Sequence, residues 1–187
     1  MPGTIARRSQ SNPVATRRFQ AEVVAAGGET VMGITGIPQD LRNIEITWRG
    51  RLNAGAAASV YVALEASPVG TNYQSEYAYA MSTGMGISDA FTSPGIMVAV
   101  LPVATSLANA WGMGKIWLPE YQTTDVAFRS FHSFGCSLWN WSSTELAVWR
   151  SSGFKNQSTP VTQVYLNIAG GAQAWAANSR MYLRGWF

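Results

Sequence analysis

The sequence is short of the residues that metal binding and redox chemistry most often use. Among 187 residues there is one cysteine, Cys136, and one histidine, His132. A disulfide within the chain or a zinc site built on cysteines needs more than one thiol, so both are excluded. A lone strand histidine is typically a hydrogen-bonded structural residue, and Cys136, among apolar neighbours, is predicted to be a small core residue. We expect no metal ion and no cofactor.

Catalytic patterns are lacking as well. No serine stands in a GxSxG context, and no glycine-rich phosphate-binding motif occurs. The ten acidic residues are scattered singly, and Glu120 with Asp125 is the closest pair near a turn. Glycosidases use two carboxyl groups held at a set separation across a sugar, whereas this pair is more typical of a surface turn. We therefore expect no catalytic residue and no enzyme.

Charged residues make up only 12% of the chain, and no run of 18 or more apolar residues occurs. The second absence argues against a membrane-spanning helix. The apolar stretch AEVVAA near the start is too short for the core of a signal peptide and contains an acid, so we expect no export signal. Apolar residues reach 47% and aromatic residues 12%. This composition favours contact surfaces, on proteins or on carbohydrates.

Acidic residues are absent from the first part of the chain, where four arginines precede Glu22. The rest is nearly balanced, with nine basic and ten acidic residues. Nucleic-acid binding by the folded part would need a basic stripe there. We predict a basic arm, residues 1–28, that docks on an acidic protein surface; contact of the arm with nucleic acid and a free solvated tail are the alternatives. The proposed anchoring residues are Arg7, Arg8, Arg17, Arg18 and, as an apolar anchor, Phe19.

Helical periodicity is not convincing in any window, whereas alternation of apolar and polar residues recurs. In the segment 41–52, Ile44, Ile46 and Trp48 fall on one face of a strand. Residues 53–55 are predicted to form a hairpin turn to a strand within 59–66. The fold class is therefore all-β, an antiparallel β-sandwich of jelly-roll type over residues 29–187, with an extended N-terminal arm. Further strands are predicted at 73–81, 95–101, 113–118, 125–134, 145–151, 161–168 and 179–186.

Tryptophan is unusually frequent. Trp139 and Trp141 are two residues apart and would share one face of a strand, where paired indoles stack on a sugar or on a partner. Core or subunit-interface roles are favoured over a sugar site for this pair, and Trp175 is a third candidate contact. The chain ends on Trp186 and Phe187, which we assign to the edge of the sandwich or to a subunit interface.

Five segments, in this order along residues 29–187, carry a resemblance to a known family. They are GITGIPQDLRNIEITWRGR (33–51), TNYQSEYAYA (71–80), IWLPEYQTTD (116–125), VWRSSGFKNQSTPVTQVYLNI (148–168) and WAANSRMYLRGW (175–186). Together they resemble the small jelly-roll virion proteins of tailed bacteriophages, which include tail-fibre, head-fibre and minor structural proteins.

The resemblance implies a jelly-roll knob, commonly a homotrimer, that an N-terminal segment attaches to the portal, tail or capsid. Virions assemble in the host bacterial cytoplasm, which agrees with the absence of an export signal. We expect a non-enzymatic virion protein that acts as a fibre head or receptor-contacting projection, with a host surface glycan as one potential partner. Capsid decoration is an alternative location on the particle. A carbohydrate-binding module is the alternative of another class.

Overall fold

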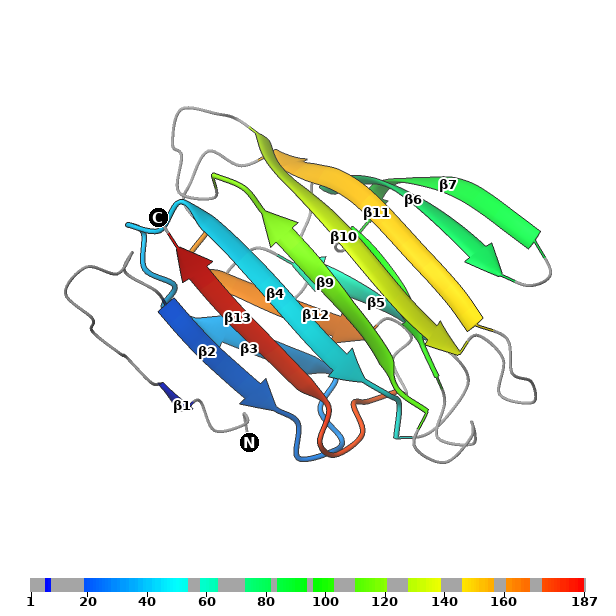
Figure 1. The fold of residues 1–187 in the computed structure, drawn as a ribbon, viewed down its shortest axis with the longest axis horizontal. Helices are drawn as coiled ribbons and strands as arrows, with labels where there is room; N and C mark the ends of the chain where they lie inside the picture. The colour runs from blue at the N-terminus through cyan, green and yellow to red at the C-terminus, as the bar shows by residue number, and fades with distance from the viewer. Residues whose placement is uncertain are drawn as a thin grey trace.

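In the computed structural model, the residues described are 6–7, 19–53, 58–63, 73–81, 84–93, 96–102, 110–120, 128–138, 146–156, 161–168 and 173–186. They form strands and connecting turns (Figure 1). Within these ranges there is no helix, and hence none that could cross a membrane. The strands are β1 (Ala6–Arg7), β2 (Phe19–Val24), β3 (Val31–Thr35), β4 (Asn43–Gly50), β5 (Ala58–Ala63), β6 (Tyr73–Met81), β7 (Gly84–Ser93), β8 (Ile96–Leu101), β9 (Gly112–Leu118), β10 (Phe128–Leu138), β11 (Leu146–Asn156), β12 (Gln163–Ile168) and β13 (Arg180–Trp186).

Eight of these strands form a jelly roll. They pair from the outside of the sequence inward: β2 with β13, β3 with β12, β4 with β9, and β5 with β8, all antiparallel. The pairs are distributed over two sheets, in the orders β2-β13-β4-β9 and β3-β12-β5-β8. A long hairpin rolled up in this way is the two-sheet architecture of the jelly roll. The predicted fold class is confirmed.

Two inserted hairpins extend one of the sheets. β6 and β7 lie between β5 and β8 in sequence, and β10 and β11 lie between β9 and β12. All four join the larger sheet, whose full order is β1-β2-β13-β4-β9-β10-β11-β6-β7. Its two ends are therefore β1, in the N-terminal segment, and β7 (Figure 1). The smaller sheet has four strands, and its β8 packs against β10 and β11.

Alternation along the strands fills the space between the sheets. In β4, Ile44, Ile46 and Trp48 point inward and are buried, as their spacing predicts. Trp175 lies just before β13 and is also fully buried; a Cβ atom on Gly50 would lie 2.3 Å from its ring. The indole therefore occupies the space that Gly50 leaves free, and the two positions are packed as one unit.

The predicted hairpin at residues 53–55 is wrong. β4 pairs with β13 and β9 in the larger sheet, whereas β5 pairs with β12 and β8 in the smaller one. The chain thus crosses from one sheet to the other between these strands. Local alternation identifies each strand, but it does not show whether two successive strands pair or face each other across the core.

The predicted boundary between arm and knob, at residue 28, is also wrong. β2 is a full member of the larger sheet, and Ala21 and Val23 are buried in the core. Gly27 and Gly28, with φ of 105° and 101°, turn the chain from β2 into β3 of the other sheet. Such positive φ angles favour glycine. The glycine pair is therefore a turn inside the sandwich and not a linker, and the sandwich begins by Phe19.

Candidate interaction surface

The face of the larger sheet that points away from the smaller sheet is called the outer face here. Side chains alternate along each strand, so the register of the sheet defines this face. β4 and β9 contribute Glu45, Thr47 and Arg49, and Met113, Lys115 and Trp117, while their intervening residues point into the core. The neighbouring strands add further outer-face side chains, which include Glu22, Glu76, His132, Phe134, Cys136, Arg150, Arg180, Tyr182 and Arg184.

The outer face carries a set of exposed apolar side chains. Of the described residues, five large apolar ones are exposed: Met85 (86%), Ile87 (73%), Phe134 (57%), Met113 (51%) and Trp117 (43%). All five lie on this one face, on β7, β9 and β10. Single exposed apolar residues are normal, but a group on one face of a sheet is typical of an interaction surface.

Charged side chains on the same face form ion pairs with each other. The Glu45 carboxylate accepts from Lys115 Nζ at 2.9 Å and from Arg184 at 2.6 Å, across β4, β9 and β13. Burial raises the pKa of Glu45, but the hydrogen bond from Lys115 and the charge of Arg184 outweigh this effect, so its pKa is lowered overall. Near β2, Arg180 pairs with Glu22 at 3.2 Å.

We predict that Glu45→Gln lowers the free energy of unfolding at pH 7 by about 1 kcal/mol, because two cations lose their shared carboxylate. The folded pKa of Glu45 lies below its ordinary value of 4.5. Its contribution is therefore fully present above about pH 4.5 and is lost as the pH falls further. Urea unfolding of both proteins at pH 7 and pH 3 measures this, and the difference between them should shrink at pH 3.

The control is Glu22→Gln. With partners among the described residues, the Glu22 side chain, 40% exposed, forms one ion pair, whereas that of Glu45, 12% exposed, forms two. Exposed single ion pairs contribute little to stability, so Glu22→Gln should lower the free energy of unfolding by less than half as much as Glu45→Gln. Equal costs for the two variants would contradict the central position of Glu45 in the cluster.

Aromatic side chains make close contacts at two other places, one with a second ring and one with an arginine. The Trp117 and His132 rings, on adjacent strands, lie 6.2 Å apart between centroids. The Arg49 guanidinium lies over the ring of Trp111, 4.6 Å from its centroid, in a cation–π contact. His132 is exposed, and its position beside an exposed tryptophan makes it part of the surface.

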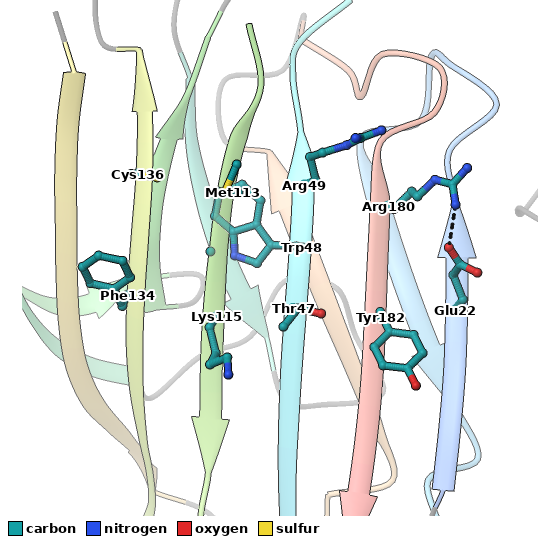
Figure 2. Close-up of a pocket in the computed structure, with 11 residues that line it drawn as sticks. Glu22, Thr47, Trp48, Arg49, Met113, Lys115, Phe134, Cys136, Arg180 and Tyr182 are labelled. Atoms are coloured by element: carbon teal, nitrogen blue, oxygen red, sulfur yellow. Dashed lines mark hydrogen bonds and ion pairs between the residues drawn. The ribbon is translucent and has the colours of Figure 1, made fainter. Parts of the chain in front are cut away.

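A shallow hollow of about 530 Å³ lies on the outer face, over β2, β13, β4, β9 and β10 (Figure 2). The short side chain of Thr47 lies between the longer side chains of Lys115 and Tyr182, its cross-strand neighbours. Met113 and Phe134 provide apolar walls. Arg49, Lys115 and Arg180 provide three cations, against the one carboxylate of Glu22. Such a lining suits the binding of an apolar or anionic group, and its described residues include no paired groups for acid–base chemistry.

Cys136 also lines this hollow and is partly exposed. The prediction that it is a core residue is therefore wrong. Its neighbours Gly135 and Ser137 are buried, so alternation directs the thiol outward. Among the described residues, no group of three or more His, Cys, Asp or Glu could hold a metal ion.

The tryptophans chosen from the sequence have different outcomes. Trp175 is fully buried, so its indole cannot stack on a glycan or a partner, and the prediction is wrong for this residue. Trp139 and Trp141 lie outside the described residues. Trp186 ends β13 half-buried, and its carbonyl accepts the N–H of Arg42 at 2.9 Å. It thus belongs to the sandwich, and its interface role stays a prediction, while Phe187 lies outside the described residues.

The predicted anchoring residues lie at the margin of the structure. Phe19 begins β2 and packs against the core, so it is part of the sandwich. The backbone of Arg7 pairs with β2, and its side chain is not described. Arg8, Arg17 and Arg18 lie outside the described residues.

The exposed apolar group was missed by the sequence analysis. Met113 and Trp117 share β9 with the core residues Ile116 and Leu118, so both faces of this strand carry apolar side chains. That double pattern is the signal that could have identified the surface.

A scan against protein-family models finds no match, and a search of curated proteins finds no relative of this chain.

Proposed function

We propose that this protein is a non-enzymatic structural protein of a bacteriophage virion. In this proposal it is an oligomeric jelly-roll knob that an N-terminal arm attaches to the particle, and it acts as a fibre head or receptor-contacting projection. The observation that carries the proposal is the group of five exposed apolar side chains on the outer face of an otherwise well-packed sandwich. Such a surface is typical of a contact site for other proteins.

Three further observations support this assignment. Jelly rolls are a common architecture of viral proteins, and this chain has the complete strand order. The ordered segments of the sequence resemble phage virion proteins. The described surface offers contacts and ion pairs but no catalytic pair. Because one fold hosts many functions, the surface carries more weight than the fold.

The topology also suits a projection attached at one end. The N-terminal segment leaves the sandwich at β2, and β1 pairs with β2 at that end of the larger sheet. The opposite end is β7, seven strands away from β2. An arm that binds the particle would therefore leave β7 and the outer face available for other contacts (Figure 1).

Deleting residues 1–18 is expected to leave a knob that folds but is not incorporated into particles. The deletion removes four arginines and the two-residue strand β1 and stops before β2, so the eight strands of the jelly roll stay intact. Circular dichroism of the purified knob measures folding, and immunoblotting of purified phage particles measures incorporation, which should fall at least tenfold. Changing the four arginines to glutamine should reduce incorporation in the same direction, because charge attraction would be lost. Normal incorporation of the shortened protein would contradict the role of the arm.

Decoration of the capsid is the alternative location, and it uses the same arm. Electron cryomicroscopy of intact particles distinguishes the two, because a projection gives density on the tail or on fibres, whereas a decoration protein gives density between shell subunits.

A further inference from the structure

β7 is an end strand of the larger sheet. On one side it pairs with β6 over residues Gly84–Ser93, and no other described strand pairs with its second side. An end strand presents a row of backbone N–H and C=O groups that can pair with another extended chain. The N–H and C=O groups on the second side of β7 are therefore available to pair with another chain.

Over residues Gly84–Ser88, β7 lacks the features that usually protect an edge, since its one acid, Asp89, and the register shift of the β6–β7 pairing come later in the strand. Lysine, proline and a short length are typical protections. The strand has ten residues, GMGISDAFTS, without lysine, arginine or proline. The other end of the same sheet differs, because β1 pairs with part of β2 there. In the smaller sheet, the end strand β8 is buried over residues 98–101 and packs against β10 and β11.

The two most exposed of the described large apolar side chains lie on this strand. Met85 is 86% exposed and Ile87 is 73% exposed, both on the outer face. Their cross-strand neighbours on β6 are Ala80 and Ala78, which are too small to cover them. On the inner side, Gly86 lies against Tyr79, where an added Cβ atom would be 2.4 Å from the ring. The edge is thus covered on its inner side and bare on its outer side.

The arrangement is symmetric about Gly86, because Met85 and Ile87 flank it on the same face. We propose that β7 pairs antiparallel with β7 of a second copy of this chain, with the two Gly86 residues opposite each other. This register sets Met85 of each copy opposite Ile87 of the other, so both apolar side chains become covered. The larger sheet then continues through a two-fold axis, and one strand supplies both sides of the contact.

Charge supports this register. Asp89 stands opposite Glu76 in the register of the β6–β7 pairing. With the axis at Gly86, the two Asp89 residues are six residues apart along the paired strands, about 20 Å at 3.3 Å per residue. A register centred on Asp89 would instead bring four acids together, which is unfavourable.

This inference goes beyond the proposed function and does not depend on it. A two-fold contact through β7 gives a dimer, whereas the resemblance to phage virion proteins implies a trimer. The contact lies at the opposite end of the sheet from the arm, so pairing would leave both arms free to bind a particle.

The test is the mass of the purified full chain, measured by sedimentation equilibrium over a range of concentrations. Wild type should show a species of twice 20.2 kDa. Ile87→Lys places a charge in the apolar contact and should raise the dissociation constant at least 100-fold. The matched control is Phe134→Lys, which changes an apolar residue of the outer face that is 57% exposed and lies away from the edge, and it should leave the dimer intact. Circular dichroism confirms that both variants are folded.

Hydrogen exchange locates the contact. Amides of residues 84–88 should be protected in wild type and should exchange at least tenfold faster in Ile87→Lys, with no change in β4. A monomeric or trimeric wild type, or dissociation by Phe134→Lys as strong as that by Ile87→Lys, would overturn the proposal. Incorporation into particles is read separately on the arm deletion, so failure of either experiment leaves the other result standing.

Discussion

Replacing Trp175 with alanine is expected to lower the free energy of unfolding by about 3–5 kcal/mol. The side chain is fully buried, and its ring lies against Gly50 on β4. The backbone around it is also fixed, because the Trp175 N–H donates to the Glu29 carbonyl at 2.7 Å and Gly28 N–H donates to the Trp175 carbonyl at 3.0 Å. A rigid surrounding cannot collapse into the space that the indole leaves, so the cavity cost adds to the loss of apolar burial.

Equilibrium unfolding in urea measures the effect, with Trp117→Ala as the matched control. Trp117 is 43% exposed on the outer face, so its replacement by alanine should lower the free energy of unfolding by less than about 1 kcal/mol. Equal losses for the two variants would mean that burial does not distinguish these tryptophans. The comparison also distinguishes a buried Trp175 from an exposed stacking platform for a glycan, since truncation of such a platform would not lower the free energy of unfolding.

Gly50→Ala provides a second, independent reading of the same packing. The new methyl group would lie 2.3 Å from the Trp175 ring, so it should destabilise wild type by about 1–3 kcal/mol. In the Trp175→Ala background the clash is gone, and the same change should cost much less. A double-mutant cycle measures this coupling. Additive effects of the two changes would show that the ring and Gly50 are not in contact.

Alternation was sufficient to locate most strands. The strand at 73–81 was predicted with its observed bounds, and β4, β12 and β13 were predicted within about two residues. β7 was missed because Gly84 and Gly86 interrupt the apolar pattern, and glycine has low strand propensity. The two glycines make sense only in three dimensions, where Tyr79 lies against Gly86. A residue whose side chain is absent so that a neighbour can approach gives no local signal.

The interaction surface was less predictable than the fold. Which face of β9 points inward depends on the strands beside it and on the sheet opposite, and a single strand does not encode this. Trp175 is predicted as a contact residue, yet its indole packs against Gly50, which is 125 residues away in sequence and gives no local signal of this contact. The arm is predicted to end at residue 28 because apolar residues are sparse before Phe19 and a glycine pair follows at 27 and 28. The alternation of Phe19, Ala21 and Val23 instead belongs to a strand of the sheet.

The N-terminal boundary of the sandwich can be tested with two deletions. Deleting residues 1–24 is expected to prevent folding, whereas deleting residues 1–18 is expected to preserve it. The longer deletion removes β2, which pairs with β13 from Phe19 opposite Gly185 to Val24 opposite Arg180. It also removes the core contacts of Phe19, Ala21 and Val23. Burial of these side chains contributes on the order of 5 kcal/mol, which is comparable with the whole stability of many domains.

The loss would also expose β13, now an edge strand whose inner residues Met181 and Leu183 have no cover on one side. An exposed apolar edge favours aggregation, so the product of the longer deletion should be insoluble or should lack a cooperative thermal transition. Thermal unfolding followed by circular dichroism compares the two proteins, and limited proteolysis of the full chain should cut before Phe19 and not within β2. A cooperative transition after removal of residues 1–24 would restore the boundary at residue 28, because β2 would then be an attachment that the sandwich does not need.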